Sequence, residues 1–209
     1  MGSPRESIMY VGARLEVVAG KQYLDQNGEP LEMPASSPFT FEIVKEDGTV
    51  VTTGNANTAG LITFDGRIPF SDEGNHTYLI REVPGSDPTV LYDQTRYRLR
   101  VTTSLGSISN PASGVETKQC YIDSIAVDKW NPDTSDWDPY IESYDPADTD
   151  KGAIRLDLGD SFVNYGGNIQ RDTSMTVTKV WNCDEAFITE SISVTLMQNG
   201  SAYSSETAT

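Results

Sequence analysis

Three polar residues with complementary chemistry lie far apart in the chain, each in or beside a run that alternates apolar and polar side chains. They are Lys21 in VVAGKQYL, Glu82 in TYLIREV and Asn164 in DSFVNYG. This alternation is typical of a half-buried β-strand, so we expect all three side chains to point into one core. An amine, a carboxyl group and a carboxamide buried together are costly unless they pair or react with one another.

Burial would give these groups the protonation states that a condensation needs. An apolar core lowers the pKa of a lysine and raises the pKa of a glutamic acid, because it disfavours the charged form of each. A neutral Lys21 is then a nucleophile toward the Asn164 carboxamide. A protonated Glu82 is expected to donate to the Asn164 carbonyl and to shuttle the proton that leaves with ammonia. The reaction would occur once, so we predict self-processing and no enzymatic turnover.

The runs that carry these residues, and those between them, predict an all-β domain. The main ones are ARLEVVAG, FTFEIVKEDGTVVTTG, HTYLIREV, YDQTRYRLRVTTSL and AIRLDLGDSFVNY. An Asp-Gly pair between alternating runs, at residues 47–48, is a strong hairpin signal. Several short strands with frequent turn signals favour an immunoglobulin-like Greek-key β-sandwich.

Changes in composition divide the chain into segments. Residues 1–13 are interpreted as a disordered lead-in and residues 14–170 as the sandwich domain. Residues 128–150 are rich in proline, aspartate and aromatic residues, which predicts a long acidic and aromatic loop inserted into that domain. Residues 171–209 are too short to close a sandwich alone, so they are interpreted as the incomplete N-terminal part of a second β-sandwich domain.

The charge balance excludes several classes of partner. The chain has 31 acidic and 15 basic residues, for a formal net charge of −16. This argues against binding to nucleic acid or to anionic lipid, and no apolar run is long enough to cross a membrane. Cys120 and Cys183 fall in different predicted domains, so two free thiols are favoured over a disulfide.

The residues give little support to a catalytic triad, a metal site or a glycoside hydrolase site. The single histidine, His76, lies in a turn, which leaves little material for a serine triad or a histidine metal site. The aspartates of residues 128–150 lack the spacing of a calcium-binding loop, so we expect neither metal nor cofactor. A glycoside hydrolase would need two carboxyl groups across one cleft, and no particular pair stands out.

The predicted insertion offers two interpretations. Its aromatic side chains would form a platform for sugar rings or a partner protein, or would fold back onto the sandwich as a small satellite core. The residues concerned are Trp130, Trp137, Tyr140 and Tyr144. The first interpretation makes the domain a glycan- or protein-binding module, which is the alternative function.

The order of the runs resembles the streptococcal-type pilin isopeptide-linkage domain of Gram-positive surface proteins. The resemblance covers roughly residues 14–167 and is most specific in FTFEI, TYLIREV, YDQTRYRLRV and FVNY. It implies that Lys21 on the first strand is bonded covalently to Asn164 on the last, assisted by Glu82 on a middle strand. The family commonly has a threonine or another strand former just before the lysine. Here Gly20 stands there, which is compatible with a bulge beside the lysine.

A second acid and a second lysine also enter the prediction. Glu42 in FTFEI is the alternative acid, but its alternation with Phe39 and Phe41 favours a position facing solvent. The segment TVTKVWNCDEAFITESISVTLMQNG resembles the start of a collagen-adhesin B-type repeat. That resemblance makes Lys179 a linking lysine, expected to be unreacted because its partners would lie on strands outside this sequence.

The two resemblances together imply a biological role. They predict a structural module of a Gram-positive cell-surface adhesin or pilus subunit, extracellular and associated with the cell wall. Expected partners are other pilus or adhesin domains and a protein or glycan on a host or neighbouring cell, with no nucleic acid and no membrane contact. Enzymatic turnover is not expected.

Overall fold

The computed structural model describes residues 8–34, 39–110, 115–167, 192–198 and 201–208. The chain divides into two compact units, residues 1–170 and residues 171–209. Among the described residues every regular element is a β-strand, and no apolar helix of membrane-crossing length is found there. The predicted all-β fold class is confirmed.

The first unit is built from one hydrogen-bonded sheet of eleven strands. They are β1 (Ile8–Val11), β2 (Ala13–Leu24), β3 (Thr40–Lys45), β4 (Val50–Ala56), β5 (Leu61–Phe64), β6 (Ile68–Phe70), β7 (Gly74–Val83), β8 (Arg96–Asn110), β9 (Val115–Asn131), β10 (Asp136–Tyr144) and β11 (Ala153–Tyr165).

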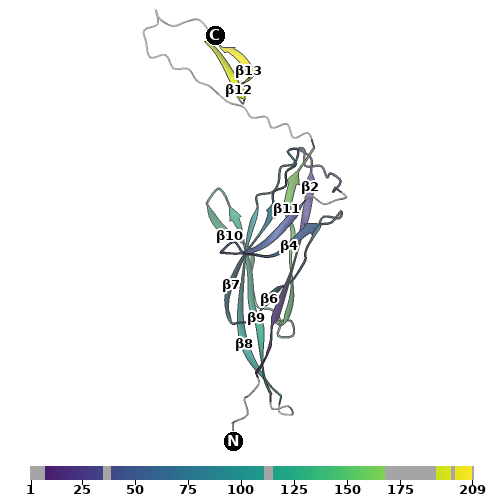
Figure 1. The fold of residues 1–209 in the computed structure, drawn as a ribbon, viewed down its shortest axis with the longest axis vertical. Helices are drawn as coiled ribbons and strands as arrows, with labels where there is room; N and C mark the ends of the chain where they lie inside the picture. The colour runs from purple at the N-terminus through teal and green to yellow at the C-terminus, as the bar shows by residue number, and fades with distance from the viewer. Residues whose placement is uncertain (1–7, 35–38, 111–114, 168–191, 199–200, 209) are drawn as a thin grey trace, which may run out of the picture. The chain divides into compact units, whose positions relative to one another are not determined.

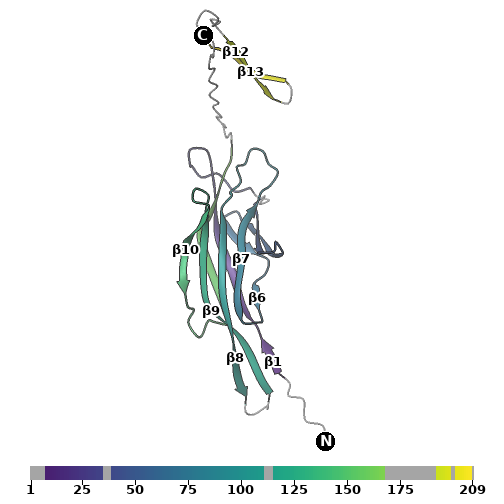
Figure 2. The ribbon, with the colours of Figure 1, turned by 90° about the vertical axis from the view of Figure 1, so that its left-hand side faces the viewer.

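The sheet curls around a single apolar core, as expected for an immunoglobulin-like β fold (Figure 1). Its strand order is β1-β9-β8-β7-β3-β4-β5-β2-β11, with β10 added beside β9 and β6 beside β2. Figure 2 shows β8 and β9 running along much of the first unit, with β1 near one end of them. Large buried side chains fill the interior, among them Phe41, Tyr97 and Phe162.

The predicted Asp-Gly hairpin is confirmed between β3 and β4. Gly48 has a φ of 84°, a left-handed conformation that glycine adopts without steric cost. The Asp47 carboxylate accepts a hydrogen bond from the Thr49 backbone N–H at 2.9 Å, which fixes the turn. On the other side of β3, the pairing with β7 places Phe41 opposite Glu82.

The strands that carry Lys21 and Asn164, β2 and β11, are parallel neighbours. Their register shifts between Asp157 and Asp160 and again between Asp160 and Phe162, so the bulge lies on β11. After the shifts Phe162 lies opposite Lys21, and Asn164 lies opposite Tyr23. Each shift adds a residue to β11, which draws Asn164 back along β2 toward Lys21 while keeping its side chain on the inward face.

Gly20 makes this bulge possible. A Cβ atom at Gly20 would lie 2.4 Å from the Asp160 carboxylate and 3.1 Å from the Gly159 carbonyl. The glycine that departs from the family pattern therefore leaves room for the close approach of β11. Two tyrosine hydroxyls brace the bulge, because Tyr97 donates to the Ser161 carbonyl at 2.8 Å and Tyr140 donates to the Leu158 carbonyl at 2.7 Å.

The interpretation of residues 1–13 as a disordered lead-in is wrong for their second half. Ile8–Val11 form β1, which pairs in parallel with residues 116–119 of β9, and β2 already begins at Ala13. The free edge of β9 supplies the hydrogen-bonding partners that the local sequence alone does not reveal.

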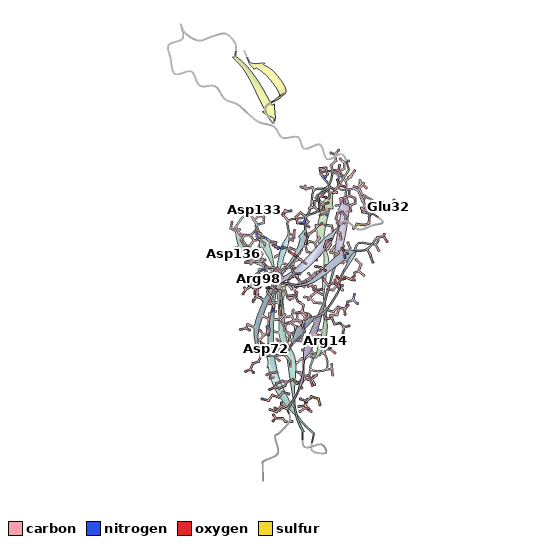
Figure 3. All side chains as sticks on the ribbon, viewed as in Figure 1. Arg14, Glu32, Asp72, Arg98, Asp133 and Asp136 are labelled. Carbon is pink, nitrogen blue, oxygen red and sulfur yellow. The ribbon has the colours of Figure 1, made fainter. Side chains whose placement is uncertain are left out.

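The insertion at residues 128–150 also differs from the predicted irregular loop. Its first residues continue β9, and Asp136–Tyr144 form β10, paired antiparallel with β9. Trp137 lies opposite Trp130 across this hairpin, and Asp133 and Asp136 lie at its turn (Figure 3). Pro139 is tolerated because β10 is an edge strand that pairs only with β9.

The second unit contains one described hairpin. Its strands are β12 (Ile192–Gln198) and β13 (Ser201–Ala208), which pair antiparallel from Ile192 with Ala208 to Gln198 with Ser201. Lys179 and Cys183, singled out from the sequence, lie outside the described residues.

Candidate functional site: a buried lysine, glutamate and asparagine

Three strands carry the predicted triad into the core through simple alternation. On β2, Ala13, Leu15, Val17 and Ala19 point inward, and Lys21 continues the same series. On β7, Tyr78 and Ile80 precede Glu82 in the same way, and on β11 Phe162 precedes Asn164. Lys21 and Glu82 are each 4% exposed, and Asn164 is fully buried.

Glu82 links the other two members of the triad. The Lys21 Nζ lies 2.8 Å from Glu82 Oε2, and the Asn164 Nδ2 donates to Glu82 Oε1 at 2.6 Å. The carboxyl group therefore contacts the amine with one oxygen and the carboxamide nitrogen with the other. The structure brings together all three residues singled out from the sequence.

Aromatic side chains keep the amine away from water. The Lys21 Nζ lies 5.2 Å from the centroid of the Phe39 ring and 5.6 Å from that of Phe41. Phe41 in turn packs against Phe162, with 5.0 Å between ring centroids. No buried side-chain nitrogen or oxygen in the described residues lacks a hydrogen-bond partner, so the polar groups of the triad satisfy one another in an apolar setting.

The electrostatics of the site favour neutral groups. Burial lowers the pKa of Lys21, although the nearby Glu82 opposes the shift. Burial raises the pKa of Glu82, although Lys21 and the hydrogen bond from Asn164 oppose it. Because both shifts disfavour charge, a proton can pass along the 2.8 Å contact from the amine to the carboxyl group, which leaves a nucleophilic amine.

Asp93 is a fourth member of the site that the sequence reasoning missed. Its backbone N–H donates to the Asn164 Oδ1 at 2.7 Å, while its side chain accepts from the backbone N–H groups of Thr95 at 2.7 Å and Val163 at 2.6 Å. The expected hydrogen bond from Glu82 to the Asn164 carbonyl is therefore replaced. Glu82 faces the amide nitrogen, and Asp93 faces the oxygen. The pattern Asp-x-Thr at residues 93–95 was the only local signal, typical of an Asx turn.

Glu42, the alternative acid, takes no part in these contacts. It lies opposite Arg81 in the β3–β7 register, and its carboxylate is 2.6 Å from the Arg81 guanidinium. The Arg81 side chain is 46% exposed, which places this ion pair at the solvent face of the sheet. The choice of Glu82 over Glu42 follows from the strand alternation.

The aromatic residues of the insertion do not gather into one platform. Trp130 and Trp137 contact each other at 5.3 Å, and the guanidinium groups of Arg96 and Arg98 lie over them at 4.7 and 4.8 Å. Tyr140 packs against the core residue Tyr97 at 4.9 Å. Tyr144, at the other end of β10, is 39% exposed.

The remaining polar residues of interest have structural partners. His76 Nε2 lies 2.9 Å from the Thr103 hydroxyl, and its ring packs on Phe70. Cys120 is a buried free thiol whose pKa is raised by burial. Within the described ranges, no group of three or more His, Cys, Asp or Glu side chains is arranged to hold a metal ion.

Comparison with known proteins gives one family match. No curated protein matches the chain. Residues 18–119 match the family model of FctA, described as a Spy0128-like isopeptide containing domain. The matched segment includes Lys21, Glu82 and Asp93, whereas Asn164 lies beyond it and enters the site through the fold. The resemblance to a collagen-adhesin B-type repeat stays a prediction. Over residues 18–119, which are just under half of the chain, the sequence is similar to this isopeptide-containing domain family.

Proposed function

We propose that this chain is a structural module of a Gram-positive cell-surface adhesin or pilus subunit, stabilised by a self-formed Lys21–Asn164 isopeptide bond. The observation that carries the proposal is the contact of one buried carboxyl group, Glu82, with both the Lys21 amine and the Asn164 amide nitrogen. The FctA-type match over residues 18–119 supports the pilin-type context.

The proposed reaction is an amide exchange that needs no cofactor. The neutral Lys21 Nζ attacks the Asn164 Cγ and forms a new C–N bond. Glu82 accepts a proton from Nζ at one oxygen and delivers a proton to Nδ2 from the other, so its own proton count is unchanged. The bond between Cγ and Nδ2 then breaks, and ammonia leaves. The product is a secondary amide between two side chains, and the protein is not regenerated for a second turnover.

The position of the bond suits a mechanical role. Lys21 and Asn164 lie on adjacent parallel strands, β2 and β11, near opposite ends of the first unit's sequence. Tension applied through the chain would pass from one strand to the other through the covalent bond. The strands that lie between β2 and β11 in the sequence, β3 to β10, would then carry little of the load. A secondary amide also resists reducing agents that would break a disulfide.

The cross-link is also expected to stabilise the fold. It would close a loop of more than a hundred residues. If its effect on the unfolded chain resembles that of a disulfide, it raises the free energy of unfolding by about 5 kcal/mol. Such a domain would stay folded at the cell surface without a dense disulfide framework, which agrees with an extracellular location.

Intact-mass spectrometry of the purified chain tests the proposal. The unmodified protein should be lighter than its sequence mass by one ammonia. Lys21→Ala should show its full sequence mass. Lys45→Ala is the matched control, because Lys45 is an exposed lysine on the neighbouring part of the sheet, and it should still lose one ammonia. A full sequence mass for the unmodified protein would refute the proposal.

Ligand binding on the β9–β10 hairpin is a second candidate function. Trp130 and Arg96 line a groove of about 750 Å³ that also reaches Glu42 and Arg81. The mixture of an aromatic ring with both charges fits a polar glycan or peptide. Trp130→Ala should abolish binding in a glycan or peptide array if this function is real, and should leave the loss of ammonia unchanged.

A further inference from the structure

The segment from Leu91 to Thr95 is fastened to β11 on both sides of Asn164. Leu91 exchanges backbone hydrogen bonds with Tyr165, at 2.7 and 3.2 Å. The Asp93 carboxylate accepts from the Val163 N–H at 2.6 Å. Between these two attachments, the Asp93 N–H donates to the Asn164 Oδ1 at 2.7 Å. Three consecutive residues of β11 are thus held by one short segment that precedes β8.

The orientation of the Asn164 carboxamide follows from its two partners. A backbone N–H can only donate, so the amide oxygen must face Asp93. The Glu82 carboxyl group, which bridges to the Lys21 amine, then receives the amide nitrogen. Any rotation of the carboxamide by half a turn would set two donors against each other at Asp93. The reacting carbon is therefore presented with its oxygen and its leaving nitrogen on fixed sides.

We infer that the Asp93 main-chain N–H is the oxyanion donor for the condensation, and that the Asp93 carboxylate is the positioning group that holds it there. This inference rests on the proposed Lys21–Asn164 reaction. When Nζ adds to Cγ, the pair of electrons of the C=O bond moves onto Oδ1, and the negative charge develops at the atom that Asp93 N–H already contacts. When the C–N bond to Nδ2 breaks, the electron pair returns and the carbonyl is restored.

The carboxylate of Asp93 fixes the donor from both directions. One oxygen accepts the Thr95 N–H at 2.7 Å within its own turn, and the other accepts the Val163 N–H on β11. The N–H group is thereby tied both to its own loop and to the strand that carries the electrophile. Donors that are fixed before the reaction stabilise developing charge without reorganisation, which is why they contribute strongly in a dry site.

The chain offers a matched control for this role. Asp87 forms the same local turn, since its carboxylate accepts from the Thr89 N–H at 2.9 Å and from the Thr89 hydroxyl at 2.6 Å. None of its hydrogen bonds reaches β11. Replacing Asp87 therefore removes an equivalent turn in the same connection and leaves the attachment to Val163 in place.

The test measures the rate of ammonia loss during refolding from denaturant of freshly made, unreacted chain, followed by intact mass. Asp93→Asn and Asp93→Ala should slow the reaction by about tenfold or more, toward the loss of about 100- to 1,000-fold seen when an oxyanion donor is removed. Asp87→Ala should react at the unmodified rate. Equal rates for unmodified protein and both Asp93 variants would overturn the inference while the proposed function stood. An unmodified protein of full sequence mass would overturn both.

A spectroscopic measurement separates positioning from a general loss of structure. In the unreactive Lys21→Ala background, NMR should show a strongly downfield Asp93 amide proton and a downfield Asn164 carboxamide carbon. Adding Asp93→Asn should move the carboxamide carbon upfield, and adding Asp87→Ala should not. If Asp93→Ala fails to fold, the inference is tested on the Asp93 amide proton of the single Lys21→Ala variant. An ordinary chemical shift with rapid exchange with solvent would overturn the inference.

Discussion

Two polar clusters in the first unit, each built around a buried carboxyl group, show opposite uses of that group. Glu82 lies in the core with Lys21 and Asn164, and burial raises its pKa. Asp128 lies on β9 and is just as little exposed, at 4%. Burial alone would raise the pKa of Asp128, but hydrogen bonds from Arg100 and Arg98 lower it.

The difference comes from the partners and their access to water. Both arginines of Asp128 are partly exposed, at 33% and 52% of the side chain, and hold it with contacts of 2.8 to 3.0 Å. Guanidinium groups stay charged in proteins, so Asp128 stays charged too. The partner of Glu82 is a lysine whose own side chain has no exposure, and a lysine can release its proton. One carboxyl group is set up for a permanent ion pair, and the other for proton transfer.

The largest expected effect is at Glu82. Glu82→Ala should leave the chain at its full sequence mass, because Glu82 is the acid that contacts both the Lys21 amine and the Asn164 amide nitrogen. Loss of the cross-link should lower the free energy of unfolding by about 5 kcal/mol, measured by guanidinium denaturation. Glu82→Gln keeps the shape of the side chain and should behave in the same way. A Glu82→Gln protein that still loses ammonia would contradict the role of the acid.

The pH dependence of the reaction should reveal the coupling between the two groups. The reactive pair has a neutral Lys21 and a protonated Glu82, and burial moves both pKa values in that direction. The refolding-coupled rate of ammonia loss should fall in acid, where the pair gains a proton and Lys21 is charged. It should fall again in alkali, where Glu82 loses its proton. A rate that rises steadily with pH would show that the acid form of Glu82 is not needed.

Asp128 should give a moderate effect on stability and none on the reaction. Asp128→Asn is expected to lower the free energy of unfolding by about 2 kcal/mol, because it weakens charge-assisted hydrogen bonds from two arginines. Since folding lowers the pKa of this carboxyl group, its contribution is present above the unfolded value and is lost as the pH falls through the folded value. The variant should still lose one ammonia by mass. An Asp128→Asn chain of full sequence mass would show that Asp128 is also needed for the reaction, against the difference drawn between the two clusters.

Glu42 should give the smallest effect. Its ion pair with Arg81 lies at the exposed face, so Glu42→Ala should change the free energy of unfolding by no more than about 1 kcal/mol. Intact mass should again show the loss of one ammonia. A Glu42→Ala chain at full sequence mass would instead make Glu42 the working acid.

The inward placement of the triad was predictable, because the two-residue period of a strand fixes the face of every side chain. The series from Ala13 to Lys21 continues without a break, and Ile80 leads directly to Glu82. The hairpin at Asp47 and Gly48 was equally local. These features depend on neighbours within one or two strands.

What could not be predicted depends on pairing between distant segments. The bulge of β11 brings Asp160 close to Gly20, which leaves room for it, and neither residue signals the other along the sequence. The contact of Asp93 with Asn164 joins residues that are 71 positions apart. The aspartates and Pro139 of β10 indicated a loop. The segment instead forms strand β10, which pairs with the edge of β9, and Trp137 contacts Trp130 across the two strands.

Tandem mass spectrometry of a proteolytic digest can locate the bond between Lys21 and Asn164 itself. We expect one branched peptide in which a segment containing Lys21 is joined to a segment containing Asn164. Its mass should be that of both segments less one ammonia, and its fragment ions should place the junction at those two side chains. Recovery of the two segments only as separate, unmodified peptides would contradict it.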